Sequence, residues 1–235
     1  MVRHVGWRAL RLADGGVVTA QNWPGLTAVD LRTRFLARPN DRGSETPLAG
    51  TSPEFGDHRL NPDLVAEMAK SHSREAAVLV PVVDYGDEAT VILTTRTRSL
   101  RKHSGQVAFP GGAVDDTDAS AEAAAMREAF EEVALEPRFV EPIGRLPRYL
   151  TTTGFRITPV VAIVAPGYDL VPNPDEVEDV FEVPLGFLMD AANHRQESRM
   201  FEGLVRHYYT MPFGERFIWG VTAGILRTLY ERYYA

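Results

Sequence analysis

Two short apolar runs separated by a single turn constrain the fold of this chain most. Residues 76–83 read AAVLVPVV and residues 89–95 read ATVILTT, and Tyr85-Gly86-Asp87 stands between them. Segments rich in β-branched residues and bounded by a glycine-containing turn predict two strands joined as a hairpin. These two strands are the starting point for the fold prediction.

Further strand and helix patterns follow along the chain. Similar apolar segments predict additional strands in residues 157–165, 177–185 and 204–213. The last segment, from Glu215 to Tyr234, predicts an amphipathic helix. Its apolar residues at helical spacing are Ile218, Val221, Ile225, Leu229 and Tyr233. Strands therefore surround one central helix, and a second helix ends the chain, which predicts a mixed α/β fold built in layers.

The first 62 residues are predicted to form an extension that packs on the main domain. Residues 1–37 mix short strand-like and helix-like pieces. Residues 38–62 are rich in Pro, Gly, Asn, Asp and Ser, which indicates a long surface connection. Residues 63–235 are then expected to form the main domain.

The composition is that of an ordinary globular protein without membrane spans. The chain has 235 residues, 44% of them hydrophobic and 24% charged, and no stretch approaches the roughly 18 apolar residues of a transmembrane helix. The absence of cysteine excludes disulfides and thiol nucleophiles and fits a cytoplasmic location, as does the lack of a secretory signal pattern. A formal net charge of -7 argues against a stable nucleic-acid partner.

Residues 111–135, GGAVDDTDASAEAAAMREAFEEVAL, hold the most unusual charge pattern of the chain. Asp118 or Ser120 can cap a helix there, and Pro137 limits it on the other side. At about 100° per residue, four apolar side chains share one face that is expected to be buried. They are Met126, Ala129, Phe130 and Val133. The acidic side chains are expected on roughly the opposite face.

Glu128, Glu131 and Glu132 crowd this helix within little more than one turn. Like charges at this spacing repel, and Arg127 can pair with Glu131 four residues later but cannot neutralise all three acids. A solvated, charged helix face is the simplest explanation for any three such acids. A hard cation such as Mg²⁺ or Mn²⁺ would instead remove the repulsion, because such ions prefer clustered oxygen ligands.

This stretch resembles the Nudix box, whose pattern is G-x5-E-x7-R-E-U-x-E-E-x-G-U, with U a bulky aliphatic residue. The matching residues are Gly112, Arg127, Glu128, Glu131, Glu132 and Leu135. Three positions depart from the pattern. Asp118 stands in place of the first Glu and lies one residue too far from Arg127, while Ala129 fills the first U position and Ala134 replaces the Gly. The R-E-x-x-E-E core is intact.

The resemblance implies an α/β Nudix fold, an α/β/α sandwich with a mixed sheet in which the box forms a loop, a helix and a loop. It also implies a site for divalent ions, Mg²⁺ or Mn²⁺. The ligands that it implies are Glu128, Glu131, Glu132 and a backbone carbonyl at Gly111 or Gly112. Arg127 would orient one of the glutamates through a charge-assisted hydrogen bond.

A dense basic patch precedes the box in an otherwise acidic chain. Its members are Arg96, Arg98, Arg101, Lys102 and His103. Basic residues at a strand end are often only solvated, but arginine side chains also bind the oxygens of a diphosphate. The segment resembles the extra signature of coenzyme A pyrophosphatases within the Nudix family, L-L-T-x-R-[SA]-x3-R-x3-G-x3-F-P-G-G. The matching residues are Leu93, Thr94, Arg96, Arg101, Gly105, Phe109, Pro110, Gly111 and Gly112, and Ile92 and Thr97 are mild departures.

This second resemblance implies hydrolysis of the pyrophosphate bond of coenzyme A or its thioesters, giving 3′,5′-ADP and 4′-phosphopantetheine or its acylated form. The substrate contacts that it implies are Arg96, Arg101, Phe109, Gly111 and Gly112. The expected partner is a small diphosphate substrate. Formation of a homodimer is an open alternative. Other Nudix substrates, such as ADP-ribose, NADH or an oxidised nucleotide, remain alternatives. So does a ligand sensor without turnover, which the intact glutamates disfavour.

One acid outside the box is a further candidate. The loop NPDEVED, residues 173–179, precedes a predicted strand. In Nudix enzymes a loop acid in this region can approach the metal or act as a base, so Glu176 joins Glu128 as a contender for the proton acceptor. A solvated acidic turn explains the loop equally well. The catalytic residues implied together are Arg127, Glu128, Glu131, Glu132 and Glu176.

Overall fold

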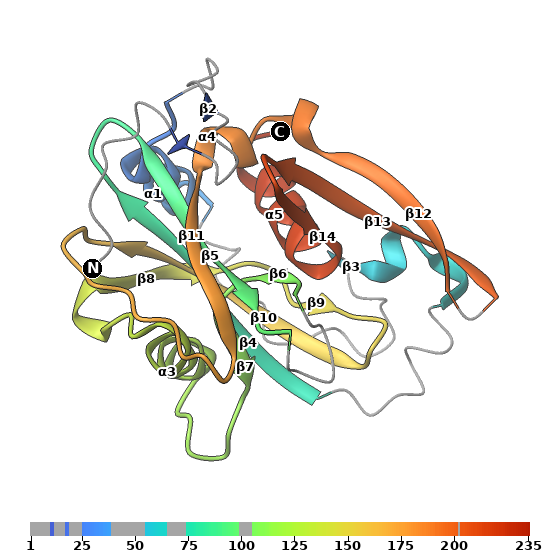
Figure 1. Ribbon diagram of the computed structural model, residues 1–235, viewed down its shortest axis with the longest axis horizontal. Helices are drawn as coiled ribbons and strands as arrows, with labels where there is room; N and C mark the ends of the chain where they lie inside the picture. The colour runs from blue at the N-terminus through green and yellow to red at the C-terminus, as the bar shows by residue number, and fades with distance from the viewer. Residues whose placement is uncertain are drawn as a thin grey trace.

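A nine-stranded mixed sheet forms the centre of the protein (Figure 1). The computed structural model describes residues 10–11, 17–18, 25–38, 55–64, 74–98, 105–201 and 203–235. The strands of this sheet follow the order β11-β5-β4-β10-β9-β3, and β6, β7 and β8 pair with β5, β4 and β10. Their bounds are β3 Phe55–Gly56, β4 Arg74–Asp84, β5 Ala89–Arg96, β6 Val107–Ala108, β7 Gly111–Ala113, β8 Val140–Arg145, β9 Tyr149–Leu150, β10 Phe155–Val164 and β11 Val177–Pro184.

The predicted strands of this sheet are confirmed. β4 and β5 pair antiparallel and form the expected hairpin, with Val82 opposite Val91. β10 runs parallel to β4 along its whole length, from Phe155 opposite Arg74 to Val164 opposite Val83. β11 pairs antiparallel with β5 and forms one edge of the sheet. The apolar runs therefore lie side by side at the centre of the fold.

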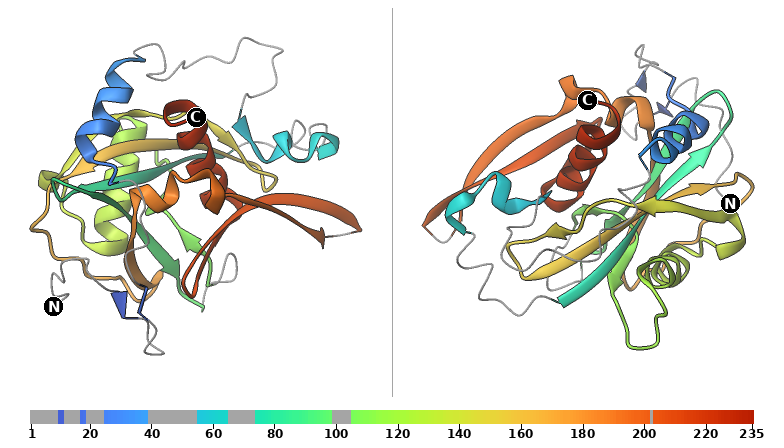
Figure 2. Two further views of the ribbon diagram at one scale, coloured as in Figure 1. Left: turned by 90° about the horizontal axis from the view of Figure 1, so that it is seen from above. Right: turned by 180° about the vertical axis from the view of Figure 1, so that it is seen from behind.

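Helices cover both faces of the main sheet (Figure 2). Helix α3, Ala121–Val133, packs on one face over a core that includes Leu79, Ile92 and Val160. On the other face lie α1, Ala28–Leu36, and α5, Gly220–Tyr233, where the rings of Phe35 and Tyr233 stack. The shorter helical segments are η2 Asp57–Arg59, η3 Pro62–Leu64, η4 Pro137–Phe139, α4 Leu185–Leu188 and η5 Ala191–Asn193. The α/β/α sandwich is therefore confirmed. Among the described helices, none has both the length and the apolar character needed to cross a bilayer.

A second sheet of three antiparallel strands stands beside α5. Its strands are β12 Arg195–Phe201, β13 Leu204–Phe213 and β14 Arg216–Trp219, and a separate two-stranded pair joins β1 Leu10–Arg11 and β2 Val17–Val18. The predicted start of the last helix, at Glu215, is wrong. Strand β14 occupies the first part of that segment, because Ile218 pairs opposite Met211 and both side chains are fully buried in the core. Helix α5 begins at Gly220.

Part of the segment predicted as a surface connection is instead built into the fold. β3 pairs in parallel with β9, and Phe55 is buried. The Asn61 amide nitrogen donates to the His207 carbonyl at 2.9 Å, and its oxygen accepts from the His207 N–H at 2.8 Å. The prediction is therefore wrong for residues 55–61, whereas residues 39–54 lie outside the described residues. The division of the chain after residue 62 stays a prediction.

The buried face of helix α3 is rotated from the one predicted: Ala129 and Val133 are buried as expected, but Glu132, expected on the opposite face, is buried as well. Its buried residues are Ala124, Ala125, Ala129, Glu132 and Val133. Phe130 is 50% exposed, so its predicted burial is wrong. Small alanine side chains let the helix approach β4 and β7 closely, which brings the glutamates to the edge of the buried face. Ser120 caps the helix, because its hydroxyl accepts a hydrogen bond from the Ala123 N–H.

Helix α3 ends at Ala134 in the left-handed conformation, with φ 56° and ψ 28°. This is the position where the box pattern has Gly, which adopts that conformation without steric cost. We expect Ala134→Gly to raise the free energy of unfolding by about 1 kcal/mol. The same change inside the helix, Ala123→Gly, is expected to lower it by about 0.5–1 kcal/mol. Urea unfolding of both variants measures the difference, and equal shifts would contradict the explanation.

Candidate active site

The two glycines before α3 bring its glutamates against the main sheet. Gly111 and Gly112 belong to β7 and pair with Val78 and Ala77 of β4. A methyl group on Gly112 would lie 2.6 Å from the Glu128 carboxylate, and one on Gly111 would lie 2.5 Å from the Ala77 carbonyl oxygen. Only glycine therefore leaves room for a carboxylate to lie directly on this backbone.

Glu132 is the buried acid of the site, with 2% of its side chain exposed. The Gly111 N–H donates to its Oε2 at 3.2 Å, and the Arg96 guanidinium lies 3.4 Å from its Oε1. Burial, together with the negative charges of Glu176 and Glu128, raises the pKa of Glu132 to about 7 against the opposing effects of Gly111 and Arg96. The positive charge near the Glu132 carboxylate is therefore too small to offset its burial.

The other two glutamates of the helix differ in exposure. Glu128 is largely buried and accepts a hydrogen bond from Arg127 at 2.9 Å, and burial raises its pKa. Glu131 is 53% exposed, and its carboxylate lies 3.2 Å from Arg127. Glu128 and Glu132 thus face the glycine turn together, while Glu131 stands at its rim. Within the described residues, no three acidic or histidine side chains are grouped closely enough to hold a metal ion by themselves.

A loop docked on the end of α3 brings a further acid to the same place. The Asn173 N–H donates to the Glu132 carbonyl at 2.8 Å, and the Asn173 carbonyl accepts from the Glu176 N–H at 3.0 Å. The Thr97 N–H donates to the Glu176 carbonyl at 2.9 Å, which ties the loop to the end of β5. The negative charge of Glu176 raises the pKa of Glu128 as well as that of Glu132. The structure therefore brings Glu176 together with the two buried glutamates of α3.

Comparison with known proteins decides the family. Residues 73–203, more than half of the chain, match the model of the NUDIX domain. The chain belongs to the Nudix family. It is 47% identical over 165 residues to an uncharacterized Nudix hydrolase, NudL, of Cronobacter sakazakii, a match that covers 69% of this chain and 85% of the relative. The NudL protein of Escherichia coli K12 is 47% identical over 156 residues, with 66% of this chain and 81% of the relative covered.

Solved structures with a similar fold are more distant in sequence. The crystal structure of DR0079 from Deinococcus radiodurans has a TM-score of 0.45 and 17% sequence identity, and the match covers 69% of this chain and 83% of that one. A Nudix hydrolase of M. smegmatis, RenU, has a TM-score of 0.38 and 23% identity over 48% of this chain and 71% of that one. The family assignment rests on the sequence matches.

Arg127 of the Nudix box is held among several oxygen atoms. Its guanidinium contacts both carboxylate oxygens of Asp118 at 3.1 and 2.9 Å, and it donates to the Ala113 carbonyl at 3.2 Å. The carboxylates of Glu128, Glu131 and Asp115 also lie within ion-pair distance of it. The hydrogen bond from Arg127 lowers the pKa of Asp118. Asp118, one of the three departures from the Nudix pattern, therefore lies in the turn before the helix as an ion-pair partner of the box arginine.

The basic segment before the Nudix box is divided among different environments. Arg96 reaches Glu132, as described above, whereas the side chain of Arg98 is 84% exposed and lies 3.7 Å from Glu178. Arg101 lies outside the described residues. Phe109 is 4% exposed within the core on the α5 side of the sheet, which gives it a packing role, and its substrate contact stays a prediction. Of the predicted substrate contacts, Arg96 and the two glycines lie at the site.

Asn173 is a residue that the sequence interpretation missed. Besides its backbone contacts, its Oδ1 accepts a hydrogen bond from the Asp175 N–H at 3.2 Å, which closes a tight turn just before Glu176. A signal was available in the sequence, because Asn173 stands between two prolines, Pro172 and Pro174. Proline fixes its own φ angle and restricts the residue before it, so this segment has few alternative conformations.

The donor set of this site fits a hard divalent cation. Glu128 and Glu132 supply carboxylate oxygens beside a backbone that a Cβ atom would block, and Glu176 adds a third negative charge nearby. Mg²⁺ and Mn²⁺ prefer such oxygen ligands, and Mg²⁺ binds through one or two carboxylates while keeping several waters. Burial, reinforced by neighbouring negative charges, raises the pKa of Glu128 and of Glu132, and a bound cation would offset both effects.

Proposed function

We propose that this Nudix protein hydrolyses the pyrophosphate bond of coenzyme A or its thioesters, releasing 3′,5′-ADP and 4′-phosphopantetheine or its acylated form. The observation that carries the proposal is the contact between Arg96 and Glu132. It joins the arginine of the coenzyme A-type segment to the most buried acid of the Nudix box. Mg²⁺ or Mn²⁺ as cofactor, a small diphosphate substrate and a cytoplasmic location belong to the same proposal.

The glutamates of α3 would hold the cation. Glu128 and Glu132 are the ligands we assign, with the backbone carbonyl of Gly112 beside them and the exposed Glu131 reaching the ion from the rim. When bound, the cation would polarise the phosphate oxygens and lower the pKa of a water molecule. Arg127 keeps Glu128 oriented through its hydrogen bond.

The remaining residues bind the substrate and move one proton. Arg96 is placed to donate hydrogen bonds to a phosphate group next to the α3 glutamates, and Arg101 joins it in our assignment. Glu176 belongs to the loop docked on the end of α3, and we assign it as the base that takes the proton of the attacking water. Glu128 is less suited to that role because Arg127 already holds its carboxylate. Positioning and charge stabilisation then supply most of the rate enhancement.

A substrate panel with product identification tests this proposal. The purified protein is incubated with Mg²⁺ or Mn²⁺ and with coenzyme A, ADP-ribose, NADH or 8-oxo-dGTP, and the products are identified by mass spectrometry. We expect kcat/KM for coenzyme A to exceed the others by about tenfold or more, with 3′,5′-ADP as a product. Faster cleavage of another substrate would overturn the coenzyme A assignment, and binding without turnover of any of them would favour a sensor.

The turn at Asn173 provides a prediction about the position of Glu176. Asn173→Ala removes the hydrogen bond to the Asp175 N–H, so we expect kcat to fall by about 5–20-fold with little change in KM. Asn173→Asp keeps an acceptor oxygen and is expected to retain most of the activity. Steady-state kinetics of both variants measure the difference.

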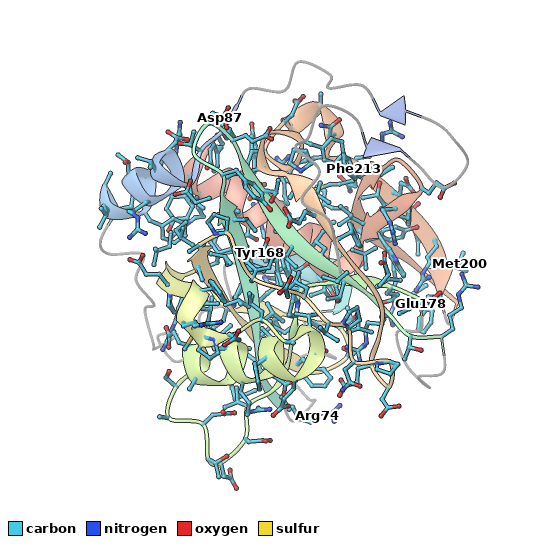
Figure 3. The ribbon with its side chains drawn as sticks, turned by 60° about the vertical axis from the view of Figure 1, so that its left-hand side comes forward. Arg74, Asp87, Tyr168, Glu178, Met200 and Phe213 are labelled. Carbon is cyan, nitrogen blue, oxygen red and sulfur yellow. The ribbon has the colours of Figure 1, made fainter. Side chains whose placement is uncertain are left out.

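Asp84→Ala is the matched control for this prediction. The Asp84 carboxylate accepts from the Gly86 N–H at 3.0 Å in a similar turn between β4 and β5. That turn, marked by Asp87 in Figure 3, lies at the end of the molecule opposite α3. Asp84→Ala is expected to leave kcat unchanged. Equal losses of kcat in Asp84→Ala and Asn173→Ala would show that Asn173 has no specific effect on the site.

A further inference from the structure

Strand β12 is an exposed edge of the three-stranded sheet. The sheet has the order β12-β13-β14, so within the described residues only β13 pairs with β12. The two strands pair without a bulge from Arg195 opposite Thr210 to Phe201 opposite Leu204. The hairpin that they form extends beyond the body of the molecule (Figure 2). An edge strand of this length presents a row of backbone N–H and C=O groups to which another strand can add.

The end of this hairpin also exposes large apolar side chains. They are Met200, Phe201, Leu204 and Val205, between 41% and 67% exposed. In Figure 3 Met200 lies at the outer rim of the molecule, away from α3. Grouped exposed apolar residues beside an unpaired strand are typical of a protein–protein contact.

Charged residues on an edge strand often prevent association, and β12 carries three of them, Arg195, Glu197 and Arg199. If all of these charged side chains had the same sign, they would repel a second copy of the strand in every register. Here the signs are mixed, and Glu197 and Arg199 lie two residues apart on one face of the sheet. Both are also held in place, because Glu197 accepts from the Thr210 hydroxyl at 3.0 Å and Arg199 lies over the Trp219 ring at 4.7 Å.

One antiparallel register of two β12 strands pairs these charges favourably. With Ser198 on the two-fold axis, Glu197 lies opposite Arg199 of the second copy, and Arg199 lies opposite its Glu197. A register centred on Glu197 would instead place the two Glu197 carboxylates together and Arg195 opposite Arg199. A register centred on Arg199 would place two arginines together. Cross-strand pairs of opposite charge stabilise a sheet and like pairs destabilise it, so the strand is self-complementary in the Ser198 register.

We propose that β12 is the contact surface of a homodimer, in which two copies pair antiparallel about Ser198 and form one continuous six-stranded sheet. In this register Phe201 lies opposite Arg195 of the second copy, so each ring is covered by an arginine side chain. The surface lies apart from the glutamates of α3, and the proposal does not depend on the substrate. A symmetric pair of identical surfaces is the commonest arrangement of homo-oligomers.

The absence of cysteine from the chain makes a direct test possible. In the proposed register the two Ser198 residues face each other at about 4.5–5.5 Å between Cα atoms, within the range of a disulfide. Ser198→Cys is therefore expected to give a covalent dimer under mild oxidation on a non-reducing gel. Gln196→Cys is the matched control, because its two copies would be separated by four residues, or about 13 Å along the strand, and is expected to stay uncrosslinked.

A charge exchange tests the register independently. Light scattering of the wild-type protein is expected to show a dimer. Glu197→Arg is expected to raise the dissociation constant of the dimer by roughly tenfold, because an arginine at position 197 of each copy then lies opposite Arg199 of the other copy. Adding Arg199→Glu to that variant is expected to restore the wild-type constant to within about threefold. A monomeric wild-type protein, equal crosslinking of both cysteine variants, or no recovery in the double variant would each overturn the proposal.

Discussion

Replacing Glu132 by Gln is expected to abolish turnover and, at the same time, to stabilise the metal-free protein. Turnover is lost because the neutral amide supplies no negative charge to a cation; we expect kcat to fall by about a thousandfold or more. The gain in stability comes from removing a buried carboxylate whose pKa is raised to about 7. The folded state therefore binds a proton that the unfolded state releases near pH 4.5.

The sign of this effect sets its pH dependence. Because the pKa of Glu132 is higher in the folded protein, its favourable contribution is present below pH 4.5 and is lost as the pH rises through about 7. At pH 8 the folded wild-type protein holds a buried negative charge, and Glu132→Gln is expected to be more stable by about 1–3 kcal/mol. Near pH 5 the wild-type carboxylate is protonated, so the two proteins are expected to differ little.

Thermal unfolding in the presence of a chelator, at pH 5 and at pH 8, measures this difference. Adding Mg²⁺ or Mn²⁺ is expected to raise the Tm of the wild-type protein at pH 8 and to leave that of Glu132→Gln almost unchanged. Glu131→Gln is the matched control, because Glu131 is half-exposed and its removal relieves little buried charge. A variant that stays active, or one that is less stable than the wild-type protein at pH 8, would contradict this account of Glu132.

Replacing Arg127 by Met is the second change with a large expected effect. The guanidinium connects the turn at Asp118 and Ala113 to Glu128 and Glu131 of the helix. Without it, the largely buried Glu128 carboxylate loses its hydrogen-bond donor. We expect the free energy of unfolding to fall by about 1–3 kcal/mol and kcat to fall by about 10–100-fold.

Two further variants separate the geometry of Arg127 from its charge. Arg127→Lys keeps the charge but cannot reach several carboxylates at once, so we expect it to recover only part of both losses. Arg138→Met removes an arginine that is 70% exposed and pairs with Glu136, and it is expected to change stability by less than about 0.5 kcal/mol. Urea unfolding and steady-state kinetics measure these effects. Full activity in Arg127→Met would show that Glu128 does not depend on Arg127.

The local features of this fold could be predicted from the sequence. The central runs of β4, β5 and β10 are mainly apolar and rich in β-branched residues, so their strand character could be predicted without knowing their partners. The helix face was misjudged because Phe130 is more apolar than the alanines beside it. The small side chains face the sheet, since only they allow the close approach that places Glu132 under the glycine turn.

Features that depend on distant segments could not be predicted in this way. The backbone of Asn173 holds the Glu132 carbonyl, and Asn61 binds His207, over long separations in sequence. The same holds for Ile218, whose place in β14 is decided by its pairing with Met211. Asp118 is a related case, because its role follows from the turn that brings it to Arg127 and not from the spacing of the Nudix pattern.

A crystal structure with Mn²⁺ and a methylene-bridged, non-hydrolysable diphosphate analogue tests the central claim most directly. We predict an ion within about 2.0–2.5 Å of carboxylate oxygens of Glu128 and Glu132. The two phosphate groups of the analogue would lie beside the ion, and Arg96 would contact them. An ion bound elsewhere, or an analogue bound away from the glycine turn with both glutamates unchanged, would contradict the assignment of this site.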